Sequence, residues 1–163
     1  MRRPPTSFLV CFFVYLSMGC VNLVDAQPLP ITRHGDLEVA AAWARATPPA
    51  ARTGAVYVTL INHGQAADRL LSASSSAAAR AELHAHLNEG GVMRMKALDV
   101  IVLAPGERVS LHPSGLHVML VDLKAPLREG TRLTLTLGFA KAGEVTLEVP
   151  VLRNPPAEAG PGH

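Results

Sequence analysis

From residue 36 onward, short apolar runs are separated by residues that favour turns. Alternation of apolar and polar residues is clearest at 132–137 and 144–149, where every second residue is Leu or Val. A strand with this period buries one face and exposes the other to water. Pairs such as Pro105-Gly106 and Glu129-Gly130 supply the breaks. The pattern therefore predicts an all-β domain with antiparallel strands.

The runs have the length of ordinary strands and follow one another at short intervals, so about seven to nine strands are expected in a sandwich or barrel. The alanine-rich stretch 73–81 contains a serine run, which favours a loop over a helical turn. The predicted strands are residues 37–44, 55–61, 70–73, 79–87, 92–98, 108–111, 116–123, 132–139 and 144–152.

The beginning of the chain has the order of a secretory signal peptide. Arg2 and Arg3 precede an unbroken apolar stretch at 8–16, and small or apolar residues accompany Asp25 just before Gln27. We expect residues 1–26 to be removed on export to the periplasm. The remaining chain would consist of a lead-in at 27–35, a β-domain at 36–153, and a flexible Pro/Gly-rich tail at 154–163.

Two other interpretations of this leader are less consistent with its residues. Residues 16–20 faintly resemble a lipoprotein cleavage site, but the leucine lies one place too far upstream, which argues against a lipid on Cys20. An uncleaved anchor is disfavoured because Ser17, Asn22 and Asp25 would make a poor membrane span. We therefore expect no membrane insertion of the mature domain.

Composition and charge narrow the functions and the metal ligands that are available to this chain. The formal net charge is only +2, and no basic run suggests nucleic-acid binding. Both cysteines, Cys11 and Cys20, lie in the leader, so the mature chain would have neither a disulfide nor a thiolate ligand. Only three methionines then remain, Met93, Met95 and Met119, and histidines lie among them.

Residues two apart in a strand share a face, and three predicted strands carry such pairs. The pairs are His84 with His86, Met93 with Met95, and His117 with Met119. A thioether is a soft, uncharged donor that suits Cu(I), and imidazole binds Cu(I), Cu(II) or Zn²⁺. Thioethers also withstand an oxidising compartment better than thiolates do. A mixed set without cysteine therefore favours copper in its cuprous state.

A purely structural role is the alternative for the same histidines and methionines. Methionine commonly fills a core, and a histidine on a strand is commonly solvated or hydrogen-bonded. The remaining histidines fit that description better than they fit a metal site: His34, His63, His112 and His163 fall in predicted loops or in the tail.

The spacing His84, ten residues, Met95, twenty-one residues, His117-any-Met119 reproduces a known motif. It resembles that of the periplasmic copper(I) chaperones of the PCuAC type. The flanks are also similar, at Ala-Trp-Ala-Arg-Ala (42–46), Thr-Gly-Ala-Val-Tyr (53–57) and Gly-Val-Met-Arg-Met (91–95). The likeness extends over residues 43–151, about two-thirds of the chain.

This resemblance implies a cupredoxin-like Greek-key β-sandwich and a near-tetrahedral Cu(I) site at its open end or rim. The implied ligands are His84, Met95, His117 and Met119. It further implies a metallochaperone with no catalytic role, which delivers copper to the copper A-containing subunit of cytochrome c oxidase alongside a Sco-type thiol protein.

The chain departs from the family pattern in three places. Leu87 and Asn88 stand where many relatives have a methionine, and Pro-Ser-Gly (113–115) replaces Pro-Gly-Gly. The tail offers only His163, which argues against a second, Cu(II)-type site. His86 and Met93 are candidate auxiliary ligands, although packing roles are expected for both.

Three other functions remain open at this point. A copper storage or tolerance protein would have the same ligands. A blue-copper electron carrier needs a cysteine thiolate, which the mature chain would lack. A β-sandwich binding module without a metal would take up no Cu(I) in stoichiometric amount.

Overall fold

The computed structural model of this chain describes residue 29 and residues 31–156. The predicted signal peptide, with Cys20 and the cleavage position, lies outside the described residues, as do residues 157–163 of the predicted tail. Those predictions therefore stay predictions.

The described residues form eleven strands and no helix. None of them, accordingly, belongs to a helix that could cross a membrane. The strands are β1 (Thr32–His34), β2 (Leu37–Arg45), β3 (Thr53–Asn62), β4 (Asp68–Ser75), β5 (Ala78–Glu89), β6 (Val92–Leu98), β7 (Ile101–Leu103), β8 (Arg108–Leu111), β9 (Leu116–Leu123), β10 (Arg132–Phe139) and β11 (Gly143–Leu152).

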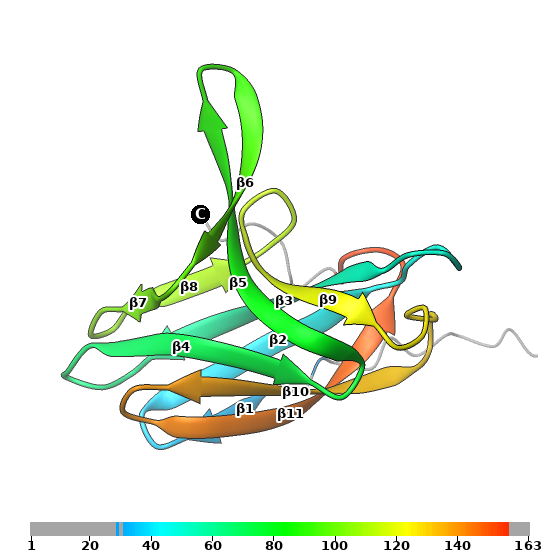
Figure 1. Cartoon of the computed structure of the whole chain (residues 1–163). Helices are drawn as coiled ribbons and strands as arrows, with labels where there is room; N and C mark the ends of the chain where they lie inside the picture. The colour runs from blue at the N-terminus through cyan, green and yellow to red at the C-terminus, as the bar shows by residue number, and fades with distance from the viewer. Residues whose placement is uncertain (1–28, 30, 157–163) are drawn as a thin grey trace, which may run out of the picture.

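Seven of these strands close into a ring, which makes the fold a barrel (Figure 1). The order is β2-β11-β10-β4-β5-β9-β3, and β3 pairs again with β2. Strands β1, β6, β7 and β8 extend the ring at its margins. Only β11 and β2 pair in parallel. The predicted all-β sandwich or barrel is thereby confirmed.

Two strands were not predicted from the pattern. β1 and β7 have three residues each, too few to show an alternation, and β1 forms within the predicted lead-in. The stretch 73–81 is also more regular than the expected loop, because β4 continues to Ser75 and β5 begins at Ala78. Backbone pairing of Ser74 and Ser75 with β10 outweighs the weak strand propensity of serine.

The core forms as the alternation requires. Leu133, Leu135 and Leu137 of β10 are buried, and the Val and Leu residues of β11 opposite them are buried as well. Trp43 of β2 is fully buried and packs on Tyr57 of β3, with ring centroids 4.7 Å apart. Full burial of a side chain such as Leu or Val contributes about 1.5–3 kcal/mol to folding before entropic costs are subtracted.

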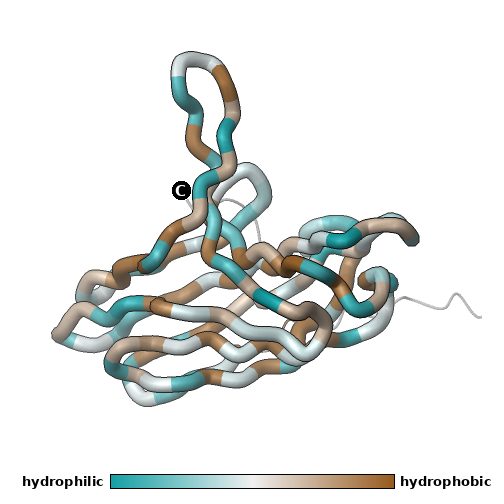
Figure 2. Tube along the Cα trace, in the orientation of Figure 1, coloured by the Kyte–Doolittle hydropathy of each residue, from teal (hydrophilic) through white to brown (hydrophobic). Residues whose placement is uncertain are grey.

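Strand β5 changes partners along its length, and this positions the site. It pairs with β9 only as far as Ala85, whereas its pairing with β6 continues from Leu83 to Glu89. The β5–β6 hairpin therefore projects beyond the ring (Figure 1). Its turn contains Gly90 and Gly91, both with positive φ. Figure 2 shows that hydrophobic segments continue into this projecting hairpin, away from the core.

Candidate metal centre

The register of three strands brings the candidate ligands together on the outer face of β5. Across the β5–β9 ladder, His84 lies opposite His117 and Glu82 lies opposite Met119. Across the β5–β6 ladder, His86 lies opposite Met95. Their neighbours in sequence, such as Leu83 and Val118, point into the core instead. Residues far apart in the chain thus form one patch of imidazoles and thioethers.

His117 is held in one orientation by the backbone. Its Nδ1–H donates to the carbonyl oxygen of Gly115 at 3.1 Å, which leaves the lone pair on Nε2. Only 3% of the residue is exposed. Burial lowers the pKa of His117; the Gly115 carbonyl partly opposes this shift, and nearby His86 and His84 add to it. The ring is therefore neutral near pH 7, as a metal ligand must be.

His84 is held by a carboxylate. Its Nε2–H donates to Oε2 of Glu82 at 3.0 Å, since an ionised carboxylate can only accept. The lone pair then falls on Nδ1, which is buried and has no hydrogen-bond partner among the described residues. A buried nitrogen without a partner costs roughly 1–3 kcal/mol. A histidine with one nitrogen on a carboxylate and the other free is a common arrangement for a metal ligand.

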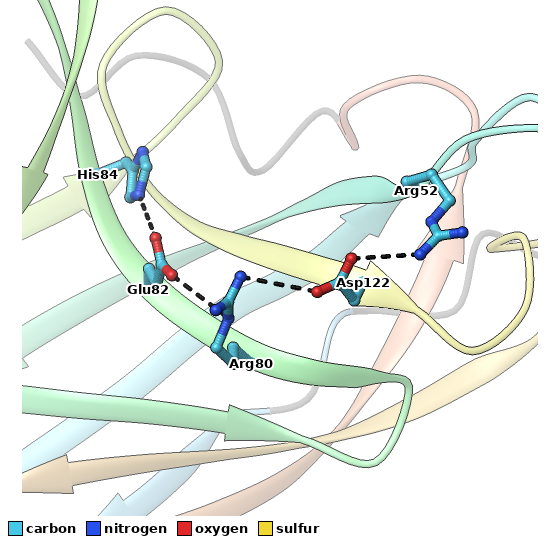
Figure 3. Close-up of polar contacts among 5 residues, drawn as sticks. All are labelled: Arg52, Arg80, Glu82, His84 and Asp122. Atoms are coloured by element: carbon cyan, nitrogen blue, oxygen red, sulfur yellow. Dashed lines mark hydrogen bonds and ion pairs between the residues drawn. The ribbon is translucent and has the colours of Figure 1, made fainter.

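Glu82 is itself part of a chain of charges that runs across β5 and β9 (Figure 3). Its Oε1 lies 3.8 Å from Nε of Arg80, and Nη2 of Arg80 lies 3.6 Å from Asp122. Asp122 in turn lies 3.4 Å from Arg52. These groups are well exposed, so each pair contributes little to stability. The chain ends at the Glu82 carboxylate, beside His84.

His117 lies next to the rings of both β5 histidines, and His86 packs against it. Its ring stacks on that of His117, with centroids 4.9 Å apart and planes 28° apart. The ring of His84 lies 5.8 Å from that of His117. The backbone N–H of His86 donates to the same Gly115 carbonyl, at 3.2 Å. Nδ1 of His86 is buried and also lacks a hydrogen-bond partner in the described part of the chain.

A cavity of about 320 Å³ opens beside these rings. His86, Met95, His117 and Met119 contribute to its wall. The remaining wall comes from the end of β2, the segment that follows it, and β3: Arg45, Ala46, Thr47, Pro48, Thr53, Gly54, Ala55 and Tyr57. Half of Met95 is exposed, so one thioether faces solvent. Burial raises the pKa of the Tyr57 hydroxyl, and Arg45 beside it partly opposes the shift.

The donor set fits a soft metal ion. In the part of the chain that the structure describes, no three or more His, Cys, Asp and Glu side chains come together as a metal site. Imidazole nitrogens with free lone pairs beside the thioethers of Met95 and Met119 match Cu(I) and serve poorly for Mg²⁺ or Ca²⁺.

The other candidates lie apart from the cavity. Met93 pairs with Asn88 farther out on the hairpin and is 55% exposed. Nε2 of His63 lies 3.0 Å from Glu38, and Nδ1 of His112 lies 2.8 Å from the carbonyl oxygen of Pro113. His34 is exposed on β1. His163 falls outside the described residues.

Sequence reasoning missed the groups that orient the imidazoles. Glu82 could have been found, because it precedes His84 by two residues and so shares its strand face. The Gly115 carbonyl and the wall residues Arg45 and Tyr57 carry no such signal, since their approach depends on pairing between distant strands.

Comparison with known proteins gives a consistent result. The family model described as "Putative lipoprotein LpqE-like" matches residues 37–151. "Putative lipoprotein Lxx21020" of Leifsonia xyli is 30% identical over 82% of this chain and 80% of that protein. "Uncharacterized protein RP573" of Rickettsia prowazekii is 31% identical, over 63% of this chain and 57% of that protein.

Solved structures resemble the barrel closely. The copper-bound PCuAC domain from PmoF2 has a TM-score of 0.66 at 28% identity, over 77% of this chain and 99% of that domain. The solution structure of CuI-DR1885 from Deinococcus radiodurans has a TM-score of 0.56 at 30% identity, over 80% of this chain and 84% of that one.

The fold and the donor set together define a cupredoxin-like domain of the PCuAC type. The chain belongs to the LpqE-like family.

Proposed function

We propose that this protein is an exported copper(I) chaperone that holds its cargo through His84, Met95, His117 and Met119. It performs no catalysis. The function is to keep one cuprous ion bound and to pass it to an acceptor.

One observation carries the proposal: two imidazoles are oriented by groups outside the ligand set, next to two thioethers. Glu82 leaves Nδ1 of His84 free, and the Gly115 carbonyl leaves Nε2 of His117 free. Such outer partners fix the tautomer and the ring orientation of metal-binding histidines. A histidine that only packs in a sheet has no need of a buried nitrogen without a partner.

The nature of the donors supports Cu(I) as the cargo. Thioethers are neutral and need no deprotonation, and they favour Cu(I) among the ions of the first transition series. Two of the similar solved structures are the copper-bound PCuAC domain from PmoF2 and CuI-DR1885. The shared spacing of His84, Met95, His117 and Met119 supports carrying that cargo over to this chain.

The position of the site supports transfer rather than permanent retention. The cavity is open to solvent, and Met95 on the projecting hairpin is half exposed. A partner could therefore approach the ion from the hairpin side. Imidazole and thioether ligands should yield Cu(I) to a partner that offers thiolates. We propose the copper A-containing subunit of cytochrome c oxidase as the acceptor, with a Sco-type thiol protein taking part.

Export to the periplasm fits this role. The proposal rests on the signal-like order of residues 1–26, and the lipoprotein names of the LpqE-like relatives support export.

A deletion strain separates delivery from storage. Loss of oxidase activity that added copper restores supports delivery, whereas copper sensitivity with normal oxidase activity would indicate a tolerance role.

The ligand assignment is tested by anaerobic Cu(I) titration against a chromogenic chelator. Changing Met95→Leu and Met119→Leu together keeps the side-chain volume and removes both sulfur donors, so the protein should fold but lose stoichiometric Cu(I). Met93→Leu is the matched control, because Met93 is exposed outside the cavity. Cu(I) uptake by the double variant with the control's affinity would show that the assignment is wrong.

A further inference from the structure

Two histidines of β5 compete for one place in this site. The cavity wall contains His86 together with Met95, His117 and Met119, and His84 is not part of that wall. His86 also lies directly opposite Met95, whereas the β6 residue opposite His84 is Ala97. The histidine that shares the cavity wall with the three other donors is thus not the one that the family spacing selects.

His84 is drawn toward Glu82, on the side of the chain of charges (Figure 3). Within residues 31–156, no carboxylate pairs with the ring of His86, which stacks on His117 instead. Both rings nevertheless have a buried Nδ1 without a hydrogen-bond partner. Each therefore carries a nitrogen whose burial a bound metal ion would compensate.

The ring distances permit either histidine to share an ion with His117. A metal–imidazole bond is about 2 Å long, so two rings on one ion have centroids roughly 4.5 to 6 Å apart. His86 and His84 lie 4.9 Å and 5.8 Å from His117, respectively. Met95, His117 and Met119 leave one position of a four-coordinate site, so the two β5 histidines would serve in turn.

We propose that His86 and His84 are interchangeable ligands for a single coordination position. Met95, His117 and Met119 stay bound throughout. His86 receives Cu(I) at the open cavity, and His84 takes over when the ion moves inward along β5; release reverses the order. The exchange rests on the proposed copper(I) function, and it lets the ion enter or leave without losing a nitrogen donor.

The test compares Cu(I) dissociation constants for four variants by competition titration. His86→Gln and His84→Gln should each weaken binding by less than about tenfold, because the other histidine substitutes, and the double variant should weaken it by about 100-fold or more. His34→Gln, on exposed β1, is the control. The inference is wrong if His86→Gln matches that control while His84→Gln alone is as damaging as the double variant.

A measurement on the unaltered protein covers the case in which a variant fails to fold. Histidine side-chain ¹⁵N resonances are followed while Cu(I) is added. The resonances of His86, His84 and His117 should all shift, and those of His86 and His84 should broaden as the two exchange. A His86 signal that stays in place while the other two shift overturns the exchange alone. Failure of the unaltered protein to bind Cu(I) overturns the proposed function as well.

Discussion

Oε2 of Glu82 lies 3.0 Å from Nε2 of His84, two residues farther along the same face of β5. The carboxylate accepts the Nε2 proton and thereby assigns the lone pair of the imidazole to Nδ1. Glu82 is thus a positioning residue for the metal centre, although the family motif does not include it.

Removing this carboxylate should weaken copper binding. Glu82→Ala leaves the ring of His84 free to rotate. Loss of such an outer partner typically costs about tenfold or more in metal affinity, but His86 can substitute for His84 here, so we expect a loss no larger than that of His84→Gln. Glu82→Gln should cost less, because its amide oxygen can still accept from Nε2. Both are measured by anaerobic Cu(I) competition. Asp122→Asn is the control, since it alters the chain of charges without touching His84; an equal loss there would contradict the positioning role.

Gly115 should tolerate no side chain. A Cβ at this position would lie 2.5 Å from Cε1 of the His112 ring, so Gly115→Ala must displace the loop or the ring. The Gly115 carbonyl accepts from Nδ1 of His117 and from the backbone of His86. We therefore expect lower thermal stability together with weaker Cu(I) binding. A variant that loses stability but binds Cu(I) normally would show that this carbonyl does not orient the ligand.

Ser114 occupies a backbone conformation that suits glycine. Its φ is +68°, and an L-residue in this left-handed region costs about 1–2 kcal/mol. Ser114→Gly should raise the free energy of unfolding by up to about 1 kcal/mol, because the greater entropy of unfolded glycine offsets part of the gain. Urea denaturation measures it. Ser76→Gly, at a turn without positive φ, should destabilise instead; equal effects of the two changes would contradict the strain argument.

Asp68, the first residue of β4, should make the stability of the fold decrease at low pH. Burial alone would raise the pKa of Asp68, but backbone N–H groups of Arg69, Ala142 and Lys141 outweigh it and lower the pKa. The stabilisation is complete above the ordinary value of 3.8 and is lost as pH falls toward the lower folded-state value.

The acid limb of a plot of unfolding free energy against pH measures this contribution. Asp68→Asn removes the titrating group. The slope of unfolding free energy against pH should therefore become shallower between roughly pH 5 and pH 2, where linkage places the loss of stability. Asp99→Asn, at an exposed position, serves as the control and should leave the slope unchanged. An unaltered slope in Asp68→Asn would mean that other carboxylates govern the acid limb.

Much of the fold could be predicted because most strands show their pattern in the local sequence. The alternation in β10 and β11 is present in the sequence, and its Leu and Val residues are those that the barrel buries. β1 and β7 are held by pairing with β2 and β4, and three residues cannot show a period. The local sequence predicts most of the strands, whereas closure of the ring through β2 and β3 cannot be predicted from the local sequence.

The candidate site was predictable to a similar degree. Residues two apart on one strand must share a face, so the pairs His84 with His86 and His117 with Met119 followed from the sequence. Which β5 histidine faces the cavity did not follow. That depends on the register of β5 against β6 and β9, which sets His86 opposite Met95 and His84 opposite His117.

X-ray absorption at the copper edge of the anaerobically loaded protein tests the central claim most directly, because it counts the neighbours of the ion. The account predicts one Cu(I) per chain with two sulfur and two nitrogen neighbours, the nitrogens at about 2 Å. The Met95→Leu, Met119→Leu variant should retain no stoichiometric copper after the same loading. A spectrum of the unaltered protein with nitrogen and oxygen neighbours alone would contradict the site.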